Sequence, residues 1–207
     1  MTIDIIGRLS PILRKRNRTM KVTKKQALEN RAHIVETAAV LFRERGYDGV
    51  GVADIMAAAG FTHGGFYKHF RSKADLMAEA AASSLAQSAT QSAGADVAGF
   101  VKEYISRKHR DAPGNGCTLA ALCSDAARQS ESVKTTFADG IESQLAALAL
   151  EDGPLNKTAK REARAKRIDT LAHVIGAIVL SRACPDDSTL ADEILEVCRT
   201  RILSQNA

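Results

Sequence analysis

Helical periodicity is the feature of this 207-residue sequence that most limits its fold. Apolar residues repeatedly fall on one face of a 3.6-residue helix. The first such face has the spacing i, i+4, i+7 and i+8: Ile34, Ala38, Leu41 and Phe42. Period-two alternation of β-branched residues is hard to find, Ala is abundant, Trp is absent and Pro is rare. We therefore expect an all-α protein with one sizeable core, or with a small domain beside a larger one.

Glycine, proline and capping residues predict where the helices end. Gly46 and Gly60 are expected to stop the first two helices, and Ser72 is expected to cap the fourth. The pattern predicts about nine helices, at about residues 25–45, 52–59, 62–70, 73–93, 97–110, 117–128, 131–150, 158–183 and 188–204. We expect three regions: a basic N-terminal arm at 1–24, a three-helix domain at 25–72, and a larger helical domain at 73–207.

The N-terminal arm concentrates more of the positive charge than its share of the chain. The formal net charge is +5, and between Arg14 and Arg31 the only acidic residue is Glu29. Basic arms of this kind commonly follow a phosphate backbone. A solvated tail that only aids solubility explains the same composition, and both interpretations stay open.

The turn Gly60-Phe61-Thr62 joins two short predicted helices, as a helix-turn-helix requires. In that motif the first helix braces the second, which places its N-terminal residues in the major groove of DNA. His63 can offer a ring nitrogen to a base edge, and the glycines at 64 and 65 let the backbone approach closely. Phe66 and Phe70 are expected to pack inward.

Several short motifs around this turn follow one another in a fixed order and spacing. They are Gly46-Tyr47, Ala58-Ala59-Gly60-Phe61-Thr62, Gly65-Phe66-Tyr67-Lys68-His69-Phe70 and Ser72-Lys73-Ala74-Asp75-Leu76. Over about residues 28–77 the chain resembles the TetR/AcrR family of transcriptional regulators. One position departs from the family pattern, because Gly51 stands where Thr is usual, and a cap and a phosphate contact are expected to be weaker there.

The resemblance implies a sequence-specific regulator, usually a repressor, that binds operator DNA as a homodimer and is released by a small hydrophobic effector. Positions 62–65 would face base edges, while Tyr67, His69 and Lys73 would contact the DNA backbone, beside Lys68. The expected DNA-binding set is therefore Thr62, His63, Gly64, Gly65, Tyr67, Lys68, His69 and Lys73. Taken singly, Tyr67 fits a half-buried core residue, His69 an ordinary surface histidine and Lys73 a solvated lysine.

The larger domain would dimerise and hold the effector. Apolar stripes on the last two helices fit a four-helix bundle with a second copy, and they fit a monomeric core equally. The residues that we expect to line an effector pocket are Phe100, Tyr104, Cys117, Leu122 and Phe137. Each of them also fits ordinary core.

The four cysteines form no CxxC pair and lack zinc-ligand spacing. We expect no metal, no cofactor, and reduced thiols. Cys117 follows a Gly-Asn-Gly loop and is expected near a helix N-terminus, which activates thiols. An alternative function is therefore a thiol-based regulator that senses oxidants or electrophiles through Cys117.

Motifs typical of the common enzyme classes are absent from the sequence. The sequence has no Walker loop, GxSxG elbow, HExxH or Rossmann glycine pattern, so we expect no enzyme. It also has no apolar stretch of about 20 residues and no signal-peptide pattern, so we expect a cytoplasmic protein without a membrane partner. An architectural protein that binds DNA without sequence preference is the remaining alternative.

Overall fold

The computed structural model describes residues 23–93, 96–148 and 156–205. Within these ranges all regular structure is helical, which confirms the all-α prediction. The elements are α1 (Lys24–Arg45), α2 (Val52–Ala58), η1 (His63–Lys68), α3 (Lys73–Ser92), α4 (Val97–Tyr104), α5 (Arg107–Asp111), η2 (Pro113–Asn115), α6 (Thr118–Ala126), α7 (Glu131–Ala147), α8 (Lys157–Arg182) and α9 (Thr189–Gln205). The predicted basic arm lies outside the described residues, apart from its last two.

Local sequence explains the helix ends. Thr23 caps α1, since its hydroxyl accepts the Gln26 N–H at 3.1 Å, and Ser72 caps α3 in the same way through the Asp75 N–H at 3.1 Å. The first helix stops at Gly46, which has φ +73°, and a residue with a side chain would be strained in this conformation. The caps predicted from sequence at Ser72 and Gly46 are therefore confirmed.

Two predicted elements differ from the structure. The third helix is a short 3-10 helix, η1, because two glycines in its first turn disfavour a regular α-helix. The prediction of a single helix over 97–110 is wrong, because the helix α4 ends at Tyr104 and Ile105 leaves the helical conformation. Ser106 then starts α5, its hydroxyl accepting the His109 N–H at 3.2 Å, and Ile105 becomes fully buried.

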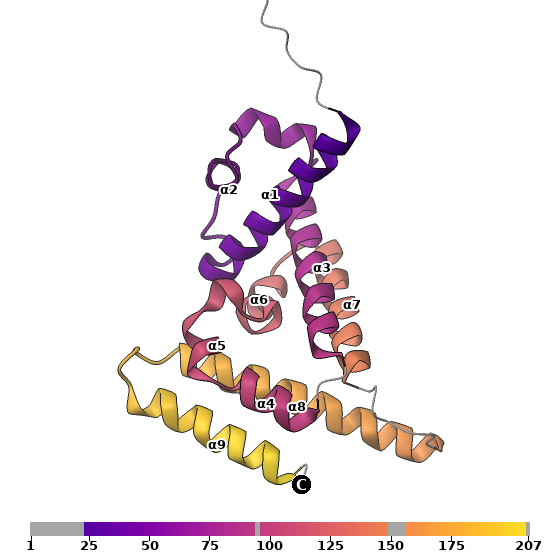
Figure 1. The fold of residues 1–207 in the computed structure, drawn as a ribbon, viewed down its shortest axis with the longest axis vertical. Helices are drawn as coiled ribbons and strands as arrows, with labels where there is room; N and C mark the ends of the chain where they lie inside the picture. Colours follow the sequence, from indigo (N-terminus) through magenta and orange to yellow (C-terminus); the bar gives the residue numbers. More distant parts are fainter. Residues whose placement is uncertain (1–22, 94–95, 149–155, 206–207) are drawn as a thin grey trace, which may run out of the picture.

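The helices form an elongated molecule (Figure 1). The elements α1, α2 and η1 make a small unit at one end, and α3 leads from it into the body, where it packs along α7. This packing is close because Gly140 of α7 lies against Leu85, whose Cδ1 would be 2.4 Å from an added Cβ. The antiparallel pair α8 and α9 lies across the opposite end.

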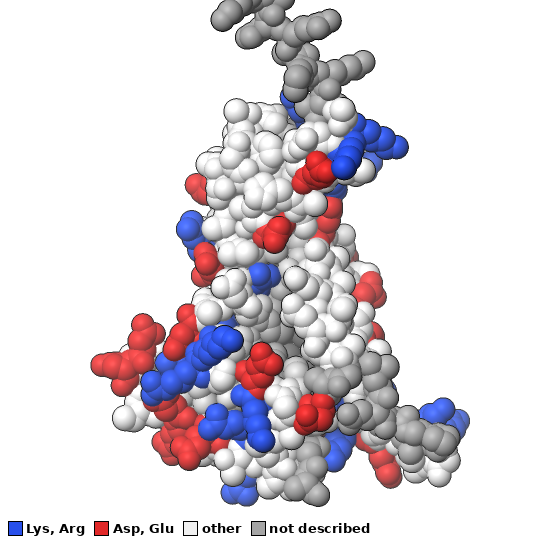
Figure 2. Space-filling model, in the orientation of Figure 1, with Lys and Arg blue, Asp and Glu red and all other residues white. Residues whose placement is uncertain are grey.

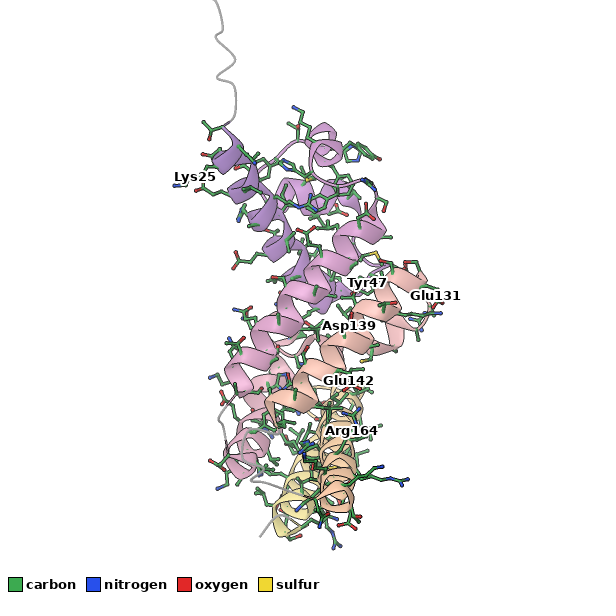
Figure 3. All side chains as sticks on the ribbon, turned by 90° about the vertical axis from the view of Figure 1, so that its right-hand side faces the viewer. Lys25, Tyr47, Glu131, Asp139, Glu142 and Arg164 are labelled. Carbon is green, nitrogen blue, oxygen red and sulfur yellow. The ribbon has the colours of Figure 1, made fainter. Side chains whose placement is uncertain are left out.

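The body and the small unit share one continuous core. Buried apolar side chains run from Ile34 in α1 to Ile202 in α9. Figure 3 shows the outer edge of this packing, where Glu142 of α7 and Arg164 of α8 form an ion pair at 2.6 Å. Among the described residues, no helix is both long and apolar enough to cross a lipid bilayer.

Candidate nucleic-acid interface

The element η1 presents polar side chains outward from an apolar base. Tyr67 is 69% exposed, while Phe66 and Phe70 are only 1% and 3% exposed, as predicted. The Tyr67 ring rests edge-on against Phe66, at 5.3 Å between centroids, and against His63, at 6.4 Å. Tyr67 is thus a supported surface side chain, and its alternative interpretation as a half-buried core residue is wrong.

The other predicted contact residues share this surface to different degrees. Thr62, His63, Gly64 and Lys68 are exposed, while Gly65, His69 and Lys73 are half-buried. Burial lowers the pKa of His69, and the cations Arg31 and Lys68 lower it further. At neutral pH His69 is therefore an uncharged hydrogen-bonding group.

A tight turn fixes η1 relative to α2. Gly60 has φ +78°, in the left-handed region that favours glycine, and the Phe61 N–H donates to the Met56 carbonyl at 2.8 Å. Thr62 takes the N-cap position of η1, but its hydroxyl makes no capping bond. At the start of α2, Gly51 likewise has no side-chain cap, and the Asp54 carboxylate accepts its N–H at 3.0 Å.

Arg31 holds η1 from behind, a role that sequence reasoning missed. Its guanidinium donates to the His69 carbonyl and to Glu79, with Nε 2.9 Å from Oε1, and stacks 4.3 Å from the centre of the Phe70 ring. The sequence groups Arg31 with the basic arm, whereas the fold turns it inward. An arginine three residues before the buried Ile34 was the only available signal.

Lys73 also points inward. Its ammonium donates to the Tyr47 carbonyl at 2.5 Å and lies 6.0 Å from the centre of the Phe42 ring. It thereby ties the start of α3 to the loop after α1. Its contact with a DNA phosphate stays a prediction.

The expected effector residues occupy the body in two groups. Leu122 and Phe137 are buried, and Leu122 borders a narrow space beside Tyr47. Phe100, Tyr104 and Cys117 are half-buried, with the Phe100 and Tyr104 rings 5.3 Å apart and the Tyr104 hydroxyl beside the thiol of Cys117. Figure 3 places Tyr47 where the small unit meets the body.

A larger groove lies beside this second group. It has a volume of about 840 Å³ and includes Arg43, Arg107, Arg110 and Arg182 in its lining, beside Asp111 and Asp186. None of the five expected effector residues lines it. No sequence pattern predicted this groove, because α1, α5, α6 and the end of α8 meet there only in the fold.

Residues 34–80 match the family model described as bacterial regulatory proteins, tetR family. The N-terminal region of the chain is therefore similar to the DNA-binding region of the TetR family. It is 42% identical over 57 residues to the HTH-type transcriptional regulator AcrR of Shigella flexneri, covering 28% of this chain and 26% of that protein. It is 54% identical over 43 residues to the HTH-type transcriptional repressor DhaR of a Mycobacterium species, covering 21% of this chain and 22% of that one. The matches thus span about a quarter of each relative's length.

Solved structures match over most of the chain. NemR of E. coli in its reduced form has a TM-score of 0.66 at 18% identity, covering 84% of this chain and 95% of that one. A TetR-family regulator from Cytophaga hutchinsonii has a TM-score of 0.59 at 20% identity, covering 89% and 98%. At sequence identities this low, the similarity shows that the chain shares the fold of these structures.

Proposed function

We propose that this protein binds operator DNA through η1 and regulates transcription. The observation that carries the proposal is the exposed polar face of η1 on a buried aromatic base, held from behind by Arg31. Rigid support of exposed polar side chains is what base and phosphate contacts need. The relatives that match this region are named HTH-type transcriptional regulators, which supports the same function.

The proposed roles follow from the exposed side chains. His63 reads base edges, while Gly64 and Gly65 let the backbone approach them. Tyr67 and Lys68 donate to phosphate oxygens, and neutral His69 adds a further donor. The three-helix unit at 25–72 is then the DNA-binding domain, and residues 73–207 form the regulatory one.

A second copy is the proposed partner of the α8–α9 face. Large apolar side chains lie exposed there, between 45% and 59%: Ile168, Val179, Leu180, Leu190 and Val197. An apolar patch of this kind on a helix pair is typical of a protein interface. Gly176 lies in the C-terminal third of α8 with open space beyond its Cα, so a partner helix can approach closely there.

Charge complementarity supports a second copy as the occupant. Figure 2 shows acidic side chains gathered around the turn between α8 and α9, and basic side chains at the other end of α8. Lys166 and Asp186 are both exposed and equidistant in sequence from Gly176. In a two-fold pair with antiparallel α8 helices, Lys166 would approach the partner's Asp186.

The dimer is tested by sedimentation velocity on the full chain. Val179→Asp should shift the population to monomer, because it buries a charge in the proposed interface. Leu28→Asp is the matched control, since Leu28 is 61% exposed on α1, away from this face. A Val179→Asp protein that sediments as the wild type does would refute this interface.

Operator binding is tested by genome-wide footprinting of the purified protein, followed by fluorescence anisotropy on the recovered site and a shuffled duplex. Lys68→Ala should weaken binding to both duplexes and reduce the slope of log K against log salt by about 0.9. His63→Ala should also reduce the difference in affinity between the recovered site and the shuffled duplex. Lys102→Ala, an exposed lysine on α4, is the control. Equal wild-type affinity for both duplexes at physiological salt would instead indicate an architectural protein.

We propose repression, with release by a signal received in the body. A hydrophobic effector near Phe100 and Tyr104 is one candidate signal. Modification of Cys117 is the second, and it is favoured by the polar groups around that thiol. Cys117 is the N-cap residue of α6, as the sequence predicted, and its N–H donates to Nε2 of His109 at 3.0 Å.

A further inference from the structure

Two buried donors that lie near Cys117 have no hydrogen-bond acceptor among the described residues other than the Cys117 thiol itself. They are the Tyr104 hydroxyl and Nη1 of Arg182. Buried donors without an acceptor are rare, because each one loses the hydrogen bond to water that it makes in the unfolded chain. Such a pair points to an acceptor that arrives with a ligand.

Both donors face the same thiol. The Tyr104 hydroxyl lies beside Cys117, and Arg182 is close enough to interact electrostatically with both of them. Nη2 of Arg182 lies 3.1 Å from where a Cβ on Gly116 would stand, directly before Cys117. The Arg182 guanidinium is anchored by the carbonyls of Arg110, at 2.9 Å, and His109, at 2.6 Å. Its free nitrogen is therefore held in place.

The surroundings of Cys117 determine the protonation of Tyr104 and His109. Burial raises the pKa of Tyr104 well above its usual value, so its hydroxyl keeps its proton. Burial lowers the pKa of His109, so its ring is uncharged at neutral pH. Nε2 of the ring accepts the Cys117 N–H, and Nδ1 lies 2.8 Å from the Tyr104 carbonyl, to which it donates. Arg43 is also close enough to Cys117 to interact with it electrostatically, and Arg43 and Arg182 both line the large groove. Solvent thus reaches the cations that flank the thiol.

We propose that Cys117 is a modification site for α,β-unsaturated carbonyl compounds, with Tyr104 and Arg182 binding the carbonyl oxygen. This rests on the proposed function, since it names one signal for that regulator. The Cys117 thiolate forms an S–C bond to the β-carbon, and the C=C π pair moves toward the carbonyl oxygen. The proton lost by the thiol returns from water to the α-carbon, so the product is a thioether and no oxidant is consumed.

Donors at the carbonyl oxygen act where negative charge develops in this addition, as in an oxyanion hole. A disulfide with Cys123 is the less suitable outcome. Burial, with a smaller contribution from Cys117, raises the pKa of the Cys123 thiol to about 11, so little thiolate is available to resolve an oxidised Cys117. Residues six apart along a helix also point in different directions.

The modification has a direct path to the DNA-binding unit. Arg43 of α1 donates through Nε, at 2.8 Å, and Nη2, at 2.5 Å, to the Gly114 carbonyl, three residues before Cys117. An adduct that displaces this loop changes how the end of α1 is held. We therefore expect the adduct to weaken operator binding.

The test measures adduct formation on the reduced full chain by intact-mass and peptide mass spectrometry, with methyl vinyl ketone as the probe. Cys117 should react first, and Tyr104→Phe should slow the reaction by about tenfold. Arg182→Gln is the second variant, in case Tyr104→Phe fails to fold. Iodoacetamide is the control reagent, because it expels iodide without building charge on its carbonyl oxygen, and both variants should keep their rate with it.

Two results would overturn the proposal: reaction first at Cys184 or Cys198, or equal slowing of both reagents in the variants. The rates are measured without DNA, so they test the chemistry independently of operator binding. Wild-type protein that binds no operator before treatment would refute the proposed function and leave the rates informative. Operator affinity unchanged by a complete Cys117 adduct would refute the signalling role, with Cys117→Ser as the unreactive control.

Discussion

Replacing Arg31 with methionine removes the support behind η1 without touching its exposed face. The change deletes the ion pair with Glu79, the bond to the His69 carbonyl and the cation–π contact with Phe70, while methionine keeps apolar packing on the ring. Because Arg31 and Glu79 are each about one-third exposed, their ion pair contributes only about 0.5 kcal/mol. The charged bond to a carbonyl adds about 1.5 kcal/mol, and the cation–π contact about 0.5 kcal/mol.

These contributions predict a loss of about 2–3 kcal/mol in unfolding free energy for Arg31→Met. The melting temperature should fall by about 5–10 °C for a chain of this size. Operator affinity at fixed salt should fall by about 10- to 100-fold, because part of the binding energy is spent on rebuilding η1.

The salt dependence of operator binding shows whether Arg31 only positions η1 or contacts a DNA phosphate itself. A positioning role leaves the slope of log K against log salt unchanged, whereas loss of one phosphate contact reduces it by about 0.9. Lys68→Ala is the comparison, with a reduced slope and a melting temperature near the wild type. An Arg31→Met protein with unchanged melting temperature and a reduced slope would refute the reasoning, because Arg31 would then contact DNA itself.

Three further predictions concern the scaffold. Gly140→Ala should lower the unfolding free energy by about 1–3 kcal/mol in urea titrations, since the new methyl group overlaps Leu85; a stability equal to wild type would show that α3 and α7 can separate freely. Gly60→Ala should cost about 1 kcal/mol, because φ is +78° there, and an unchanged urea midpoint would contradict this. His109 has a lowered pKa, so the unfolded chain binds its proton first, and stability should fall as pH drops below about 6.5. Urea midpoints between pH 7.5 and 5 should fall less in His109→Gln, and an identical fall would exclude His109 as a source.

Local signals were sufficient for most helix boundaries. Ser72 and Gly46 act through bonds and dihedral angles within a few residues, so their effect is visible in sequence. The break before Ser106 was missed because apolar spacing continues across it. Burial of Ile105, a tertiary effect, competes there with helix continuation.

The candidate DNA surface was predictable where a motif fixes residue types in register. Tyr67 and Phe66 take opposite sides of η1, as their spacing implies. Arg31 was assigned an outward role from its charge, and Lys73 was assigned one from the family resemblance. Their inward bonds, to the His69 and Tyr47 carbonyls, depend on contacts between segments far apart in sequence.

Besides α3, the end of α1 also joins the small unit to the body, and a signal from the body can travel through it. The Asp125 carboxylate of α6 accepts the Tyr47 N–H at 2.9 Å, and Arg43 holds the Gly114 carbonyl at the other end of the same region. The small unit is therefore fixed to α6 and to the loop before it through two neighbouring residues, Arg43 in the last turn of α1 and Tyr47 just after that helix. A change at Cys117, between those points, alters one attachment while the other holds. In the proposed dimer, a rotation of the small unit about Tyr47 would alter the spacing of the two η1 elements and thereby weaken operator binding.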